Sequence, residues 1–117
     1  MNTGGLDLFN LASLRLRWLS ERQGVVTQNI ASADVSGYRA KEIEPFESFL
    51  EHAVKRPTSE SAEVSEAEGA WETDLSGNNV VLEEQMVAAA DTAGQYRMVT
   101  SLYRKAHELM IAVAGRG

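Results

Sequence analysis

The sequence predicts a mainly α-helical chain in which a long N-terminal and a long C-terminal helix form a hairpin or coiled coil, joined by a short, partly irregular middle segment. Leu, Val and Ala recur at helical spacing towards both ends, and the 117 residues include only two prolines. This length has room for a single domain. We therefore expect one domain over residues 1–117, divided into an N-terminal helix (6–33), a turn, extended segment and short helix (34–56), an acidic flexible loop (57–79) and a C-terminal helix (80–114).

The N-terminal helix is predicted from apolar residues that step by three and four along residues 6–33. Such spacing places them on one side of an α-helix. The seam consists of Phe9, Ala12, Leu16, Leu19, Gln23, Val26, Ile30 and Ala33, with Gln23 as its one polar interruption. This pattern is typical of a helix that packs against other helices, either as the core helix of a small bundle or in an assembly of several chains.

The middle of the chain combines a turn, a short helix and an acidic stretch. Gly37 follows the long helix and supplies its stop or a turn with positive φ. Residues 46–54 have the amphipathic spacing of a short helix. Residues 57–79 hold six acids and no Lys or Arg, so they carry the entire net charge of −6. We expect residues 57–70 to form a mobile loop, after which Trp71 anchors the chain again.

The C-terminal helix is predicted over residues 80–114, with Asn78 or Asn79 as its N-cap and Gly115 as its end. Two neighbouring apolar seams run along it. One contains Leu82, Met86, Ala89, Ala93, Tyr96, Thr100, Tyr103, Met110 and Ala114, and the other contains Val81, Ala88, Val99, Leu102, Ala106, Leu109 and Val113. A helix that is apolar over so wide an arc is expected to contact more than one partner helix.

Residue types and spacings argue against an enzyme, a cofactor and a metal site. His107 and Glu108 begin like the helix of a zinc protease, but the second histidine four residues after the first is missing. There is no cysteine, no Gly-rich phosphate loop and no spacing that suggests a Ser-His-Asp set. The acidic balance disfavours nucleic acid as a partner. Charges interrupt the apolar runs, so we expect neither a membrane span nor a cleavable signal peptide.

Two motifs resemble those of bacterial flagellar rod and hook subunits. In that family an Asn-rich helix end followed by Thr-Pro-Gly-Tyr closes the N-terminal helix, and Gly-Asn-Asn-Val opens the last one. Here the first motif is matched by Asn29, Ile30, Ala31, Gly37 and Tyr38, whereas Val35 and Ser36 replace Thr-Pro. Residues 77–86 are similar to the second motif, with Val81 and Gln85 in place of acids.

The resemblance covers residues 6–38 and 77–115 and implies a structural role. The segment between the helices is too short for the β-rich middle domain of longer family members, so the chain is similar to the short proximal subunits of the basal-body rod. Such a subunit is exported without a cleavable signal peptide by the flagellar type III export apparatus. It stacks into a tubular assembly in the periplasm, lines the export channel and transmits torque. Its expected partners are copies of itself, other rod subunits and the basal-body adaptor at the membrane ring and export gate.

The seams supply the residues that we expect at the assembly interface. They are Leu16, Leu19, Val26, Ile30, Leu82, Met86, Tyr96, Val99, Leu102, Tyr103, Leu109 and Val113. The alternative is a cytoplasmic helical adaptor or secretion chaperone, which would share the acidic charge and the apolar helices but would not need both motifs. A monomeric helical-bundle enzyme or carrier would require a convergent polar site that the sequence does not suggest.

Overall fold

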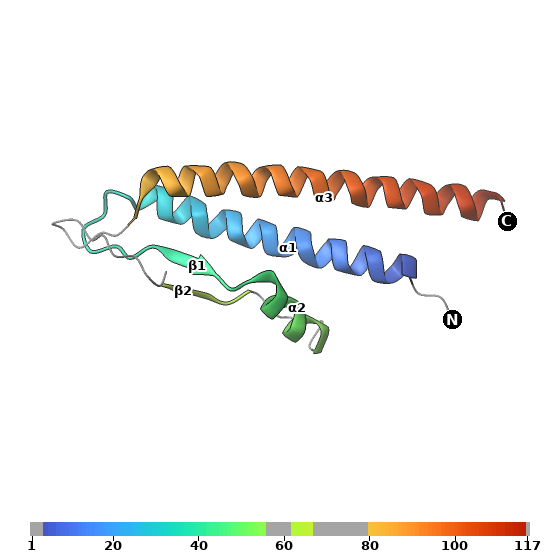
Figure 1. Cartoon of the computed structure of the whole chain (residues 1–117), viewed down its shortest axis with the longest axis horizontal. Coiled ribbons are helices and arrows are strands. Elements are labelled where there is room, and N and C mark those ends of the chain that lie inside the picture. The colour runs from blue at the N-terminus through green and yellow to red at the C-terminus, as the bar shows by residue number, and fades with distance from the viewer. Residues whose placement is uncertain (1–3, 56–61, 67–79, 117) are drawn as a thin grey trace.

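A computed structural model of the chain describes residues 4–55, 62–66 and 80–116, and it confirms the mainly helical fold. The elements follow in the order α1 (Gly4–Ala31), β1 (Lys41–Ile43), α2 (Phe46–Lys55), β2 (Val64–Glu66) and α3 (Leu82–Arg116). The long helices α1 and α3 lie side by side and antiparallel, as Figure 1 shows. The molecule is therefore elongated, with extents of 66 × 27 × 19 Å.

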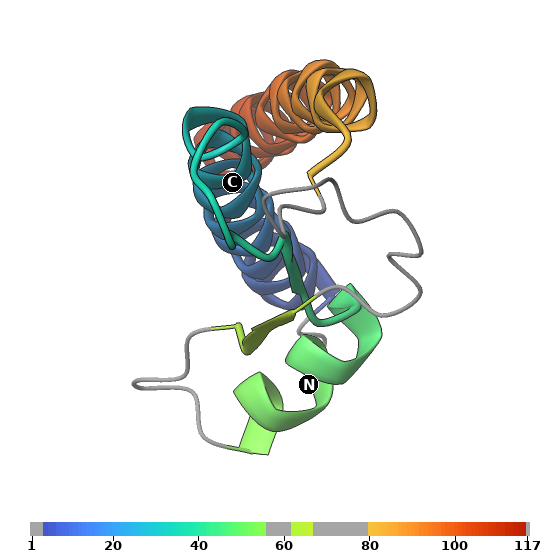
Figure 2. The same cartoon turned by 90° about the vertical axis from the view of Figure 1, so that its left-hand side faces the viewer.

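Helix α1 lies between two layers. Helix α3 lies along one side of it, and α2 with the two strands lies along the other (Figures 1 and 2). The buried core forms where α1 meets α2 and the residues before β2, and it consists of Trp18, Leu19, Phe49, Ala53 and Ala62. The short helix predicted over residues 46–54 is confirmed, because its apolar spacing turns Phe49 and Ala53 towards this core.

The two strands form a small antiparallel sheet with Lys41 opposite Glu66 and Ile43 opposite Val64. The pairing continues outside the strands, where the Glu44 N–H donates to the Glu63 carbonyl at 2.9 Å. The prediction of an acidic flexible loop is therefore wrong for residues 64–66, which form β2. All three residues of β2 are exposed, so the strand depends on backbone pairing and no apolar pattern in the sequence marks it. The anchoring role predicted for Trp71 lies outside the described residues.

The ends of the long helices differ slightly from the predicted bounds. Helix α1 ends at Ala31, two residues early, because the backbone tightens there into successive turns over residues 32–37. Helix α3 begins at Leu82, and the Val81 carbonyl accepts the Gln85 N–H at 3.1 Å. Val81 thus occupies the N-cap position, which makes the predicted asparagine N-cap wrong; residues 78 and 79 lie outside the described ranges. Gly115 does not end α3, which continues to Arg116.

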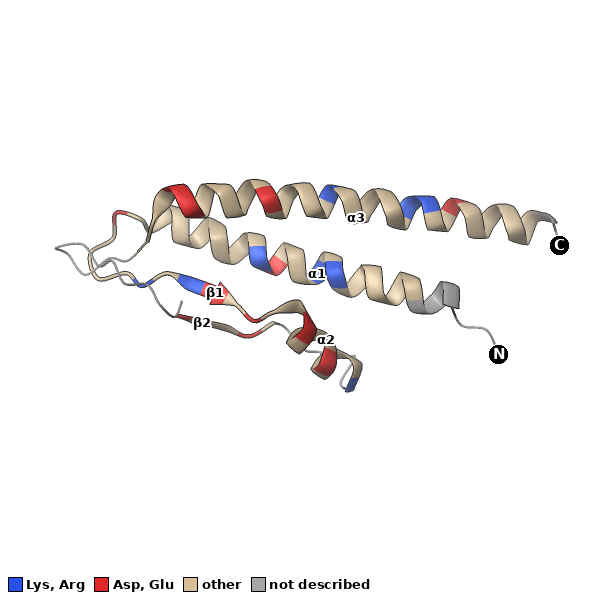
Figure 3. Ribbon diagram, viewed as in Figure 1, with Lys and Arg blue, Asp and Glu red and all other residues tan. Residues whose placement is uncertain are grey.

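Charged residues of both signs are spread along the length of the helices rather than gathered in one segment, as Figure 3 shows. Among the described residues, no helix combines the length and the apolarity that crossing a membrane requires.

Candidate assembly interface

The predicted turn motif forms a buried hydrogen-bond node around Asn29, which is 1% exposed. Its Nδ2 donates to the Lys41 carbonyl at 2.8 Å and to Gln85 Oε1 at 3.0 Å. Its Oδ1 accepts from the Lys41 N–H and from the Tyr38 hydroxyl, both at 3.0 Å. The side chain thereby uses both of its donor hydrogens and two acceptor positions. Asn29 thus ties α1, the turn, β1 and α3 together at one point.

The backbone of the turn confirms the prediction for Gly37. Its φ is +78°, in the left-handed region that glycine adopts without a steric penalty. The turn leads directly into Tyr38, whose hydroxyl returns to Asn29. Of the other motif residues, Ile30 is half-buried and Ala31 is the exposed last residue of α1.

Sequence reasoning did not select Gln85 as a site residue, although it is the contribution of α3 to this node. The sequence feature that could have identified it is that Gln85 stands where the second motif has an acid. A carboxylate at this position could accept from Asn29 Nδ2, and the Gln85 amide oxygen does so without bringing a charge to a buried side chain.

Side chains of α1 also hold the layer formed by α2 and the strands. The Trp18 indole N–H donates to the Glu44 carbonyl at 2.8 Å, and the Glu21 carboxylate accepts the Ala62 N–H at 2.8 Å. Together with the Asn29 bonds to Lys41, these contacts satisfy backbone groups of β1 and of the residues next to the two strands. The position of α2 against α1 is therefore set by directional bonds as well as by apolar packing.

Polar side chains join α1 and α3 at four positions along the hairpin. The pairs are Arg15 with Gln95 at 2.7 Å, Arg22 with Asp91 at 3.3 Å, Gln23 with the Ala89 carbonyl at 3.3 Å, and Asn29 with Gln85. Near the start of α1 the contact becomes aromatic, because the Phe9 ring packs edge-on against Tyr103 with centroids 5.1 Å apart. The two helices therefore meet without burying most of the apolar surface of α3.

Two residues expected at the assembly interface lie inside the subunit instead. Leu19 is 0% exposed and Val26 is 5% exposed, so neither can contact a neighbouring chain in this conformation. Leu16, Ile30 and Val99 are half-buried. Helical periodicity could not separate these groups, because a core contact and an assembly contact both require an apolar residue on the same face.

The remaining interface candidates are exposed on α3. They are Leu82, Met86, Tyr96, Leu102, Tyr103, Leu109 and Val113, whose exposed fractions range from 37% to 68%. Thr92, which is buried, and Val99, which packs on the core, mark the line of α3 that faces α1. Successive residues of an α-helix are rotated by about 100° around its axis, so the two seams predicted for the C-terminal helix fall on either side of this line. The expected assembly residues thus form two apolar flanks, one on each side of the hairpin.

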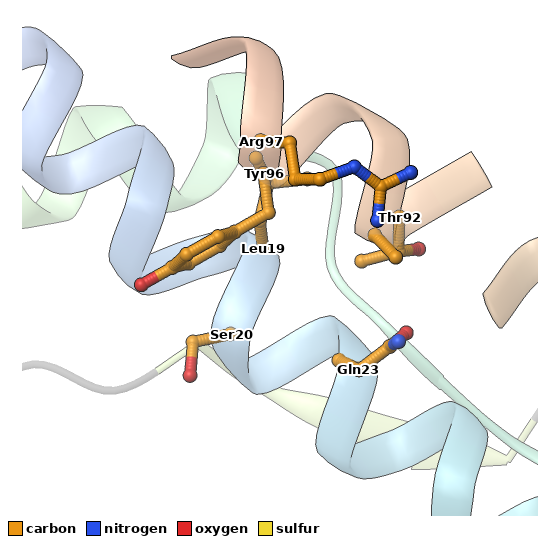
Figure 4. Close-up of a pocket in the computed structure, with 7 residues that line it drawn as sticks. Leu19, Ser20, Gln23, Thr92, Tyr96 and Arg97 are labelled. Carbon is orange, nitrogen blue, oxygen red and sulfur yellow. The ribbon is translucent and has the colours of Figure 1, made fainter. Parts of the chain in front are cut away.

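Each flank contains a groove. The smaller one, of about 320 Å³, lies between α1 and α3, and Figure 4 shows the Tyr96 ring extending from α3 towards α1 there. The larger one, of about 680 Å³, lies on the side of α2, and we call it the α2-side groove. It is lined by Leu8, Phe9, Leu11, Ala12, Arg15, Phe46, Glu47, Val99, Leu102, Tyr103, Lys105, Ala106 and Leu109. Both grooves suit apolar side chains of a partner protein better than a polar substrate.

The two histidines contact an aromatic ring and a carboxylate of the same subunit. The His107 ring packs edge-on against Phe9 with centroids 6.1 Å apart, and His52 lies 2.8 Å from a Glu44 carboxylate oxygen. Within the described ranges, no group of three or more His, Asp or Glu side chains could hold a metal ion.

Comparison with known proteins finds a relative of similar length. No protein-family model matches the chain. The chain is similar to the flagellar basal body rod protein FlgB of Agrobacterium fabrum, with 32% identity over 127 aligned positions that cover 95% of each chain. The similarity therefore extends over both long helices and the segment between them.

Proposed function

The chain belongs to the FlgB family of flagellar basal body rod proteins, and from this membership we propose that it is a structural subunit of the proximal flagellar rod. The observation that carries the proposal is the similarity to FlgB over 95% of both chains. A structural subunit needs no catalytic centre. Its function depends on surfaces that hold neighbouring subunits in place.

The exposed flanks of α3 support this proposal. Large apolar side chains, such as Met86 on one flank and Leu102 and Leu109 on the other, are 57–61% exposed in the single subunit, and exposed apolar patches favour contacts with other proteins. The flanks lie on opposite sides of the hairpin. A contact between one flank and a different surface of the next copy is heterologous, and its repetition around an axis builds a tube or helical assembly.

We further propose the finer features that accompany this role. The subunit is exported by the flagellar type III apparatus without a cleavable signal peptide and assembles in the periplasm. There it contacts copies of itself, other rod subunits and the basal-body adaptor at the membrane ring and export gate. In the assembled rod it lines the export channel and transmits torque. The residues proposed for these contacts are the exposed members of the predicted interface set on α3.

Leu109→Asp tests the proposed function. Leu109 is 59% exposed in the subunit, so a carboxylate there stays in water and should change the free energy of unfolding by only about 0.5 kcal/mol. In a packed rod wall the same carboxylate would be buried without a partner, at a cost of several kcal/mol. We expect synthesis and export of the variant but no incorporation into basal bodies, and hence no hook or filament.

The measurement is an immunoblot of purified basal bodies, of the exported fraction and of whole cells. Leu109→Met is the matched control, since it keeps an apolar side chain of similar volume and should be incorporated. Assembled hooks on rods that contain the Leu109→Asp protein would overturn the assignment of α3 to the rod wall. If the unaltered chain were found only in the cytoplasm, the adaptor or chaperone alternative would replace the proposed function.

A further inference from the structure

We propose that the α2-side groove of one subunit receives the C-terminal tip of α3, residues 110–116, from a neighbouring copy. The inference rests on the proposed rod function and deepens it, because it names the two surfaces that meet and gives α2 a part in the contact.

The tip leaves several large apolar side chains uncovered in the single subunit. Met110, Ile111 and Val113 are 43%, 58% and 68% exposed, and they point in three different directions around the helix axis. Figure 1 shows α3 running past the start of α1, so these last turns project beyond the other long helix. Residues 109–115 contain no charged side chain. A helix that is apolar all round is normally buried on all sides, which requires a partner outside the subunit.

The α2-side groove is already formed in the single subunit. Phe46 lies in its wall, held by the Trp18 ring at 5.9 Å and by the Arg15 guanidinium at 4.8 Å. The apolar lining nevertheless remains open to water, since Leu8 is 54% and Leu11 is 43% exposed. A groove that is already formed binds an apolar segment with a smaller cost of ordering than one that must first be assembled.

The dimensions and the charges of the two surfaces agree. The α3 side of the groove runs from Val99 to Leu109, roughly 15 Å of helix, whereas the seven residues of the tip span roughly 10 Å. The charged residues of the groove lining are Arg15, Glu47 and Lys105, two basic and one acidic, so the groove carries a net positive charge that favours the partial negative charge at the carboxyl end of an incoming helix. Because the tip has no charged side chain between residues 110 and 115, seating it buries no unpaired charge there.

The tip that fills the groove must come from another copy. Helix α3 is continuous from Leu82 to Arg116, so its own tip points away along the helix axis and cannot fold back into the groove beside Leu102. If each subunit gives its tip to the next, the contact repeats without closing on a pair, as a tube requires.

Cysteine cross-linking tests the contact, because the chain has no cysteine of its own. Cells would produce two versions of the chain, one with Val113→Cys in the tip and one with Leu11→Cys in the groove. Their basal bodies would be purified and oxidised. Since a disulfide forms only when the two Cα atoms lie within about 7 Å, a mixed dimer reports contact between different copies. The matched control replaces Leu11→Cys by Ser20→Cys, which lies in the smaller groove.

We expect the Val113 and Leu11 pair to give a mixed dimer roughly tenfold stronger than the Val113 and Ser20 pair. A second pair, Ile111→Cys with Leu8→Cys, tests the same contact at two other positions, so that local misfolding caused by one substitution does not decide the result. If the chain is in the basal bodies but neither groove pair cross-links, or if the Ser20 pair dominates, the inference is overturned and the rod function stands. If the unaltered chain is absent from basal bodies, the proposed function falls and the inference falls with it.

Discussion

The side-chain amide of Asn29 pairs with both backbone polar groups of Lys41, donating to the carbonyl at 2.8 Å and accepting from the N–H at 3.0 Å. It occupies the place that the peptide group of a neighbouring strand would take. Because an open strand edge can pair with other chains, this contact protects the side of β1 that faces α1 while β2 pairs with the other side. One residue of a sequence motif thus completes a sheet.

Replacing Asn29 by Ala should strongly destabilise the subunit. The change leaves both Lys41 backbone groups without their partner and removes the bonds to Tyr38 and Gln85, in a site that is 1% exposed. We expect the free energy of unfolding to fall by about 2–4 kcal/mol, measured by urea denaturation with circular dichroism. Gln28→Ala, at an exposed neighbouring position of α1, is the control. An equal effect of the two variants would contradict the role of the node.

Gly37→Val should cost about 1–2 kcal/mol through backbone strain alone. The φ of +78° is unfavourable for a β-branched residue, while a Cβ at this position would meet nothing within 4 Å. Gly37→Asn separates strain from crowding, since asparagine tolerates the left-handed region and should cost much less. Thermal melting measures the stability, and a swimming assay follows assembly. Full motility and an unchanged melting temperature with Gly37→Val would show that the turn can take another conformation.

Substitutions of the glutamates around β2 should differ sharply in their effect on the stability of the subunit. Glu21 accepts the N–H of buried Ala62 at 2.8 Å, so Glu21→Ala should speed amide exchange at Ala62 and loosen the layer that contains α2. The double variant Glu63→Ser with Glu66→Ser should change stability by less than about 0.5 kcal/mol, because both side chains are exposed. Hydrogen exchange and basal-body assembly are the measurements. Loss of assembly in the double variant would instead identify this acidic surface as a contact.

Hydrogen exchange should also show that the subunit is ordered unevenly. In a dilute monomer we expect slow exchange around Leu19, which is 0% exposed, and rapid exchange near Leu102 and Val113, where α3 lacks cover. Long isolated helical segments are marginal in water without packing on an apolar face. Incorporation into the rod should slow exchange in the last turns of α3. Equal protection along all of α3 in a verified monomer would contradict this expectation.

The sequence predicted the helices well because their apolar spacing is a local property. The N-terminal and short helices agree with the structure to within two residues at each end, and Gly37 has the positive φ that its place after a helix suggested. Strand β2 could not be predicted, since its side chains are all exposed and its partner lies more than twenty residues away. Pairing at that distance leaves no periodic signal.

The surface that is exposed and so available for assembly was predictable only in part, as Leu19 and Leu109 illustrate. Both lie on helical seams in the sequence, yet Leu19 is 0% exposed and Leu109 is 59% exposed. What separates them is the position of α2, which covers the middle of α1 and leaves the end of α3 open. The first motif likewise singled out Asn29 but did not reveal what its side chain does. Its hydrogen-bond partners Lys41 and Gln85 lie 12 and 56 positions away in the sequence.

The polar contacts between α1 and α3 have a mechanical consequence. Seams of Ala, Leu and Val repeat along a helix, so two apolar faces can slide past each other with little loss of contact. A slide by one helical turn is about 5.4 Å, which would take every donor out of hydrogen-bond reach at once. The bonds of Arg15, Arg22, Gln23 and Asn29 to α3 therefore oppose shear within the hairpin. In the proposed role of torque transmission, the hairpin would keep its length under load while both apolar flanks of α3 stay available for contacts with neighbouring subunits.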